Sequence, residues 1–178
     1  EAASRSLGRA LDVSRVGYGE IDDGEEYVTV ERDWIDGQIP SVVGKYRMDD
    51  FGPPIIHELR AGRVMSVDDV DRDPRIGAFA AAFHAIGTST VLAVPLTKEG
   101  RFRAMMFLHD PLPRKWTSND VALATEVAER TWSAVERSKA ETERARYTKR
   151  LDFLDALGKA TSALNDADEI LQKTTQML

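Results

Sequence analysis

Three histidines and one acidic run are the residues of this chain that could bind a metal or take part in catalysis. His57-Glu58-Leu59-Arg60-Ala61 begins like the H-E-x-x-H helix of zinc proteases, but alanine stands where the second histidine ligand is required. Asp69-Val70-Asp71-Arg72-Asp73 begins like a calcium loop, yet Pro74 replaces the glycine of the sixth position and Ala80 the glutamate of the twelfth. Neither run therefore predicts a metal site.

His84 and His109 lie in apolar surroundings. His84 belongs to the predicted helix 79–86, and His109 ends the apolar strand 104–109. Either side chain could point into a cavity between sheet and helix and orient a ligand or a haem, or it could be a core or rim residue with satisfied hydrogen bonds. No nucleophile stands beside a base, and no G-x-S-x-G or Walker motif occurs. We therefore expect the chain not to be an enzyme.

The composition excludes further classes of function. The chain has 178 residues, 24 Lys+Arg against 30 Asp+Glu, a net charge of −6 and no cysteine. Without cysteine there is no disulfide, no Cys-ligated metal or cluster, no thiol nucleophile and no thioether-linked cofactor. The acidic balance argues against nucleic acid as a partner, and no apolar run approaches the ~20 residues that cross a bilayer. We expect a cytoplasmic protein and, since Glu1 is not a start methionine, a piece of a longer polypeptide.

The positions of apolar residues predict the elements that carry these side chains. Residues 1–11 have leucines at helical spacing, 16–21 and 27–34 alternate as strands, and Asp23-Gly24 supplies the positive φ of the turn between them. In the second strand we expect Val28, Val30 and Trp34 to share one face. Helices over 51–62 and 79–86 each end at a glycine, and strand 63–67 and an acidic loop lie between them. Strands 88–96 and 102–109 form a central hairpin, in which Pro95 predicts a bulge or a strand end.

A long helix follows. Thr117 and Asp120 have the spacing of a capping box, an apolar stripe runs to Val135, and nine of the fifteen residues 136–150 are charged. The stripe returns at Tyr147, Leu151, Leu154 and Leu157, and residues 165–169 predict a break with a new N-cap. A continuous helix over 118–164 would be about 70 Å long. Its stripe needs a partner helix, most simply a second copy in a parallel dimeric coiled coil.

Several segments resemble the GAF family. These are Thr90–Leu96, Ala104–His109 and Pro113-Arg114-Lys115-Trp116-Thr117, and Glu126–Arg137 and 58–75 are similar to GAF modules of bacterial sensor histidine kinases of the HWE type. The resemblance covers about residues 1–137. It implies an α+β fold with a central antiparallel sheet of five or six strands, helices on both faces, a ligand pocket and a long C-terminal helix. It also divides the chain into a sensor domain (1–137), a linker or coiled-coil helix (138–164, continuing from about 118) and the start of a following module (165–178). Residues 151–178 resemble the first helix of a second GAF domain.

Departures from the family pattern exclude several of the ligand classes known in the family. The missing cysteine removes covalent bilin attachment and the thiol chemistry of the methionine-sulfoxide-reductase members, and the motif of the cyclic-nucleotide-binding members is absent. Phe79 and Ala80 stand where the phytochrome-like pattern has a histidine. His109 matches a histidine at the end of the corresponding phytochrome strand, which leaves a haem or tetrapyrrole role open.

The resemblance implies a non-catalytic sensory and dimerisation module of a two-component histidine kinase. Its partners would be a second copy through the C-terminal helix, the neighbouring sensor and kinase domains, and a small molecule whose identity the sequence does not specify. One alternative is a purely structural dimerisation domain whose own side chains fill the pocket; another is a haem or tetrapyrrole sensor. Arg75 could clamp a carboxylate or phosphate, or be a surface loop arginine. The predicted ligand-binding residues are Phe51, Arg75, Phe79, Phe83, His84, Met105, Phe107 and His109.

Overall fold

One antiparallel sheet of six strands is the centre of the fold, in the order β3-β2-β1-β6-β5-β4. The computed structural model describes residues 2–176, with the side chains of 160 and 162–176 left aside. The strands are β1 (Arg15–Ile21), β2 (Tyr27–Ile35), β3 (Gly44–Arg47), β4 (Met65–Val67), β5 (Thr90–Lys98) and β6 (Arg101–Asp110). The helices are α1 (Ala2–Leu11), α2 (Pro53–Arg60), α3 (Ala80–Ala85) and α4 (Ser118–Gln176), with 3-10 turns η1 (Met48–Phe51) and η2 (Gly77–Phe79). The predicted α+β class and antiparallel sheet are confirmed.

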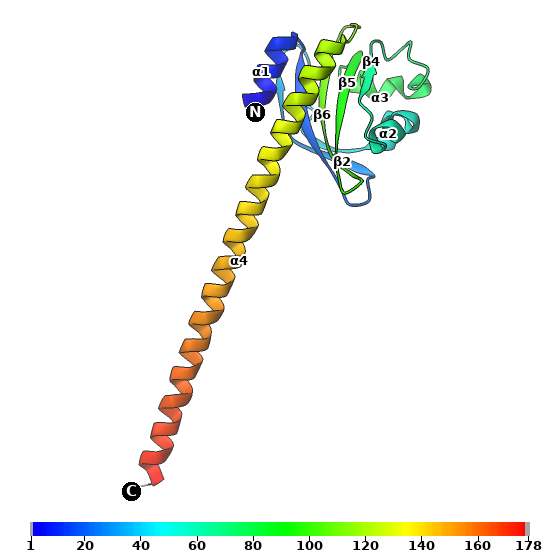
Figure 1. Cartoon of the computed structure of the whole chain (residues 1–178). Coiled ribbons are helices and arrows are strands. Elements are labelled where there is room, and N and C mark those ends of the chain that lie inside the picture. Colours follow the sequence, from blue (N-terminus) through cyan, green and yellow to red (C-terminus); the bar gives the residue numbers. More distant parts are fainter. Residues whose placement is uncertain (1, 177–178) are drawn as a thin grey trace. The chain divides into compact units, whose positions relative to one another are not determined.

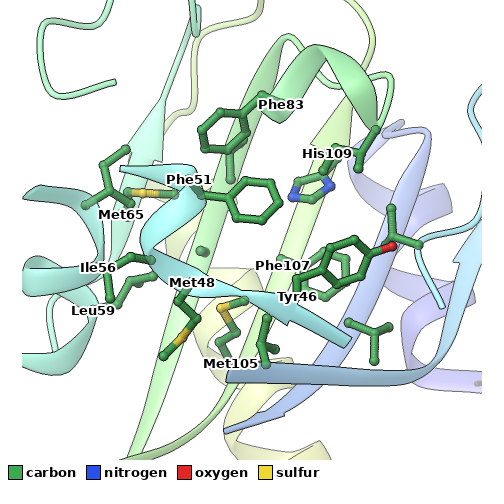
Figure 2. A pocket seen from close by; sticks show the side chains of 17 residues that line it. Tyr46, Met48, Phe51, Ile56, Leu59, Met65, Phe83, Met105, Phe107 and His109 are labelled. Atoms are coloured by element: carbon green, nitrogen blue, oxygen red, sulfur yellow. The ribbon is translucent and has the colours of Figure 1, made fainter. Parts of the chain in front are cut away.

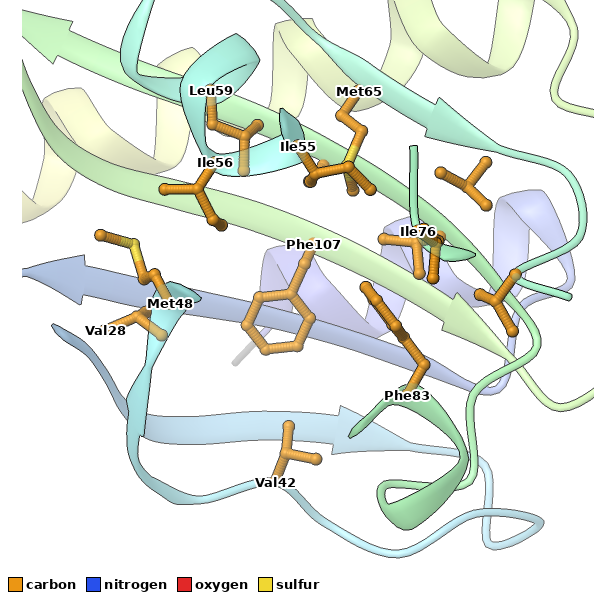
Figure 3. Close-up of a cluster of buried hydrophobic side chains, with 14 of the residues drawn as sticks. Val28, Val42, Met48, Ile55, Ile56, Leu59, Met65, Ile76, Phe83 and Phe107 are labelled. Carbon is orange, nitrogen blue, oxygen red and sulfur yellow. The ribbon is translucent and has the colours of Figure 1, made fainter. Parts of the chain in front are cut away.

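Two separate hydrophobic clusters lie on the two faces of this sheet. Figure 1 shows the helices around the sheet, and Figure 3 shows the side chains of the cluster under α2 and α3. On the helix face, Leu7 and Leu11 of α1 and Ala124 and Ala128 of α4 pack against the central strands. On the pocket face, the two short helices α2 and α3 cover the sheet, and their inward side chains meet Phe107 of β6. We use "helix face" and "pocket face" for these two sides below.

A bulge in β2 corrects the predicted face of Trp34. Tyr18 of β1 pairs with Arg32 while Gly19 pairs with Val30, so Glu31 is an extra residue in β2. One extra residue reverses the side to which every following side chain points. Val28 and Val30 therefore belong to the pocket face, whereas Trp34 packs on the helix face.

The turn before β2 and the strand after it also differ from expectation. Glu25 (φ 55°), and not Gly24, adopts the positive φ in the turn between β1 and β2. The short strand β3 was not predicted, because Gly44-Lys45-Tyr46-Arg47 has no apolar alternation and is a strand through its pairing with β2. Pro95 lies inside β5 and the bulge follows it, between Leu96 and Thr97. There β4 pairs only with Val91–Ala93, so Pro95 stands on a free edge, where a missing N–H is tolerated.

The long C-terminal helix contributes to two compact units, one up to Ser133 and one from Ala134. Its start is the predicted capping box: the Thr117 N–H donates to the Asp120 carboxylate (2.9 Å), and the Asp120 N–H donates to the Thr117 hydroxyl (3.2 Å). Its first turns pack on the helix face of the sheet. The predicted break at 165–169 is wrong, since the backbone of α4 remains helical to Gln176. The polar run Asn165-Asp166 did not outweigh the helix formers around it.

Candidate ligand pocket

A cavity of about 70 Å³ lies between the pocket face of the sheet and the segments that cover it. Strands β2, β3, β4, β5 and β6 contribute side chains from below, and η1, α2 and α3 contribute them from above (Figure 2). Nearly all of the lining is apolar: Val28, Val30, Val42, Tyr46, Met48, Phe51, Ile55, Ile56, Leu59, Met65, Phe83, Ile86, Val91, Ala93, Met105, Phe107 and His109. Such a lining suits an apolar guest, or its own side chains, rather than water.

Aromatic rings form one wall of the cavity. The Phe51 ring packs edge-on against Phe83, with 5.2 Å between centroids, and against Tyr46 at 6.2 Å. Phe107 can lie flat over β1 because residue 17 is glycine: a Cβ there would be 2.1 Å from the Phe107 ring. The pocket face therefore depends on Gly17 for its central aromatic residue.

Apart from the Tyr46 hydroxyl, one polar group interrupts the apolar lining: the imidazole of His109 at the end of β6. It stacks on Phe107, with 4.8 Å between centroids, and only 7% of the residue is exposed. Its Nδ1 lies 2.8 Å from Nη1 of Arg15, which is wholly buried at the start of β1. The side chain of His109 lies next to Phe51 and above Phe107 (Figure 2).

Arg15 joins several segments of the fold. Nη1 also donates to the Thr88 hydroxyl (3.2 Å), and Nη2 donates to the carbonyls of Pro40 (2.5 Å) and Ile86 (2.7 Å). Its Nε lies 3.8 Å from a carboxylate oxygen of Asp33. That carboxylate accepts from the Val42 N–H, so the loop before β3 is tied to the same cluster.

Burial controls the charge of His109. Desolvation, and then the nearby charge of Arg15, lower the pKa of His109 well below its ordinary 6.5. Burial also lowers the pKa of Arg15, and the Asp33 carboxylate acts in the opposite direction. At neutral pH the cluster therefore holds a neutral imidazole beside a charged guanidinium.

Five of the eight predicted ligand-binding residues line this cavity: Phe51, Phe83, Met105, Phe107 and His109. Phe79 does not; its ring lies beside Gly52 and packs on the outside of the same cluster. Whether the five bind a ligand remains a prediction.

Arg75 and His84 also lie outside the cavity. Arg75 donates through Nη2 to the Asp73 carboxylate (2.5 Å) and to the Ser66 carbonyl. The hydrogen bond from Arg75 to Asp73 lowers the pKa of Asp73. His84 lies 2.8 Å from a carboxylate oxygen of Asp71, with a half-exposed side chain. The inward position of α3 belongs to Phe83, because one short helix presents only one such position to the sheet.

Arg15 and most of the aliphatic lining were not predicted from the sequence. Arg15 follows Val13-Ser14 and precedes Val16, so an arginine among apolar residues at the start of a strand was the only signal. Tyr46 lies on the unpredicted strand β3, and Met48 and Met65 flank segments whose inward faces the spacing did not determine.

A family model for the GAF domain matches residues 1–135. The chain belongs to the GAF family. None of the curated proteins matches it. Among solved structures, it is similar to the phycocyanobilin-bound GAF domain of a cyanobacterial phytochrome, with a TM-score of 0.68 and 17% identity over 79% of this chain and 84% of that one. It is also similar to the GAF domain of Thermosynechococcus elongatus PixJ in its blue-light-absorbing form, with a TM-score of 0.64 and 16% identity over 81% of this chain and 90% of that one.

A third similar structure is the chromophore-binding domain of the bacteriophytochrome RpBphP3 from R. palustris, with a TM-score of 0.63 and 16% identity over 78% of this chain and 55% of that one. At these identities the likeness shows the GAF fold alone. GAF domains are sensory modules that are generally not catalytic, which agrees with the expectation that this domain is not an enzyme. Among the described helices, none combines the length and apolarity that crossing a membrane requires.

Proposed function

We propose that this GAF domain is a cytoplasmic, non-catalytic sensory and dimerisation module of a bacterial two-component histidine kinase, of the HWE type. A small molecule in the pocket, or a neighbouring domain, biases α4, which passes the change to a following sensor or kinase domain of the same chain. A ligand can shift such an equilibrium only by its difference in affinity for two arrangements of the helix. Residues 165–178 would begin that following module.

The observation that carries this proposal is the exposed apolar stripe on the second unit. Tyr147, Leu151, Leu154 and Leu157 recur at helical spacing on α4 and are 48–64% exposed. Charges of both signs precede them in residues 136–150, which permits the same helix of a second copy to lie alongside. A second copy in a parallel coiled coil would remove all four side chains from water at once.

Contacts at the start of α4 support a connection between the pocket and the helix. The Trp116 indole N–H donates to the Val67 carbonyl (3.2 Å) and the Thr90 hydroxyl (3.0 Å). Val67 and Thr90 lie close in sequence to Met65 and Val91, which line the cavity. A ligand that displaces β4 and the start of β5 would therefore move the hydrogen-bond acceptors of Trp116, the residue directly before the N-cap of α4.

The test is the oligomeric state of the full chain by sedimentation. We expect a dimer, and we expect the double variant Leu151→Glu, Leu154→Glu to be a monomer because charge replaces the centre of the stripe. The double variant Ala145→Glu, Ala156→Glu is the matched control: both alanines are exposed and lie on the opposite side of α4 from the stripe, so this variant should remain dimeric. A wild-type chain that sediments as a monomer at all concentrations would refute the dimerisation role.

The similar structures favour a second candidate, a tetrapyrrole sensor, because two of those described above are named for a phycocyanobilin or a chromophore. The pocket residues do not fit one. Sites for drug-sized ligands occupy roughly 300–1,000 Å³, against about 70 Å³ here, and the chain has no cysteine for attachment. No cation lines the cavity to receive propionates. Arg15 donates to Nδ1 of His109, so the proton is on Nε2, where an iron ligand would need a lone pair.

The other alternative is a purely structural domain whose pocket is filled by its own side chains, which the small cavity favours. Absorption spectra and ligand titrations of the purified chain separate these candidates. A Soret or bilin band that disappears in His109→Ala would establish the tetrapyrrole sensor. We expect no such band.

A further inference from the structure

The imidazole of His109 is held in one tautomer. An arginine is a donor only, so the 2.8 Å contact from Nη1 of Arg15 requires Nδ1 of His109 to accept. A neutral imidazole that accepts at Nδ1 carries its proton on Nε2. Among the described residues, none takes a hydrogen bond from Nε2. The ring therefore carries one N–H donor in a lining whose other polar side-chain group is the Tyr46 hydroxyl.

The charge of Arg15 is not free for a ligand. Its two Nη1 protons go to Thr88 and His109, and its two Nη2 protons go to the carbonyls of Pro40 and Ile86. Its Nε faces the carboxylate of Asp33 at 3.8 Å, which balances the positive charge. The residues that line the cavity include no Lys, Arg, Asp or Glu. An anionic or cationic guest would thus leave its charge uncompensated in an apolar site, which is costly.

The lining also restricts the size and shape of the guest molecule. The volume of about 70 Å³ is roughly half that of an engineered cavity of ~150 Å³ that admits benzene, so a guest of six heavy atoms enters only when the lining side chains move. Met65 lies apart from Met48 and Met105 in the lining (Figure 2), and the unbranched side chains of all three can move to fit an irregular guest. The Tyr46 hydroxyl also belongs to the lining, and it points away from Phe51 (Figure 2).

We propose that the pocket recognises a small, uncharged molecule with an apolar body and one hydrogen-bond acceptor, such as a carbonyl oxygen, which receives the Nε2 proton of His109. The apolar body replaces empty space among the methionine and aromatic side chains, and the acceptor takes a hydrogen bond from Nε2 of His109, for which the described residues provide no partner. This inference rests on the sensory role proposed above and assigns a ligand class to it.

Three probes of six heavy atoms test the class on the full chain. Cyclopentanone has the apolar ring and the acceptor, methylcyclopentane has the ring without an acceptor, and isobutyrate has an acceptor but is an anion. We expect cyclopentanone to bind about fivefold more tightly than methylcyclopentane, the value of one hydrogen bond in a buried site, and isobutyrate not to bind. In His109→Phe the carbonyl of cyclopentanone has no donor, so methylcyclopentane should bind more tightly than cyclopentanone.

If His109→Phe does not fold, the NMR signal of the Nε2–H of His109 in the wild-type chain provides a second test. Cyclopentanone should shift it and methylcyclopentane should not, while exposed His57 and the Asp71-paired His84 serve as internal controls. Equal affinity of the two neutral probes for the wild type would overturn the ligand class and leave a ligand-binding pocket intact. Tight binding of isobutyrate would overturn the requirement for neutrality. If no probe binds, the inference is wrong, whereas the dimerisation assay decides the rest of the proposed function separately.

Discussion

The two faces of one sheet are packed in opposite ways. On the pocket face, the contacts are made by aromatic rings, three methionines and a buried Arg15–His109 pair, and a cavity remains among them. On the helix face, leucine, valine and alanine side chains predominate between the sheet and two helices, together with Met106 and the rings of Trp34 and Trp116. A Cβ on Gly8 of α1 would be 2.0 Å from the Trp34 ring.

This difference separates two tasks within one small domain. Soft, rotatable side chains around unfilled space permit a guest or a rearrangement at little cost. Small side chains in close contact permit little relative movement of helix and sheet, because a packed interface has few alternative arrangements. The pocket face is thus suited to receive a signal, and the helix face to carry it to α4 without loss.

Replacing Arg15 should have the largest effect. In Arg15→Met the hydroxyl of Thr88, two backbone carbonyls and the Asp33 carboxylate lose a buried partner, and we expect a loss of about 3–5 kcal/mol in the free energy of unfolding. Arg72→Met, at an arginine with an 88% exposed side chain, should change it by less than about 0.5 kcal/mol. Urea unfolding of both variants measures the difference. Equal values would mean that the pocket face does not depend on this polar cluster.

A pair of alanines compares the faces directly. Ala104 on the helix face and Ala93 on the pocket face are 1% and 2% exposed, on neighbouring strands. Ala104→Val should lower the free energy of unfolding by about 1–3 kcal/mol through overpacking. Ala93→Val adds its methyl groups to the cavity lining and should be neutral or stabilise by up to about 1 kcal/mol. If both lower stability alike, as judged from urea midpoints, the contrast between the faces is wrong.

The pH dependence of stability reports on the neutral His109. Because the folded pKa is lowered well below 6.5, the unfolded chain binds the extra proton first as the pH falls. Stability from this group is therefore complete above about pH 6.5 and declines below it by up to ~1.4 kcal/mol per pH unit. Asp73, whose pKa is lowered from 3.8, loses its contribution only near and below pH 4. Between pH 5 and 7, the free energy of unfolding should therefore change less with pH in His109→Phe than in the wild type. An equal change in both proteins would contradict a buried neutral imidazole.

The smallest effect concerns the N-terminus of α4. Thr117→Ala removes one half of the capping box and should cost about 1 kcal/mol. Thr142→Ala, at an exposed position in the same helix, should change stability by less than about 0.5 kcal/mol. Because the proposed coupling runs from the pocket through Trp116 to the start of α4, we expect cyclopentanone affinity to change in Thr117→Ala and to stay unchanged in Thr142→Ala. An unchanged affinity in Thr117→Ala would contradict that coupling.

Local sequence patterns were sufficient to predict most of the helices and strands. Alternation in 16–21, glycine stops at Gly62 and Gly87, and the Thr117–Asp120 box act within a few residues, so their outcome does not depend on distant contacts. The side of β2 on which Trp34 lies could not be predicted, because the bulge at Glu31 exists only through pairing with β1. The same holds for β3, which is a strand only beside β2.

The sequence by itself determined the GAF family, the antiparallel sheet, the capped C-terminal helix and the absence of thiol chemistry, since these follow from residue types, short-range spacing and the family resemblance. Only the tertiary structure decided that Arg75 and His84 face outward to Asp73 and Asp71, and that Arg15 faces inward to His109. The physical reason is that a charged side chain is buried only where distant segments supply its partners. Those of Arg15 come from residues 33, 40, 86, 88 and 109, which no local pattern connects.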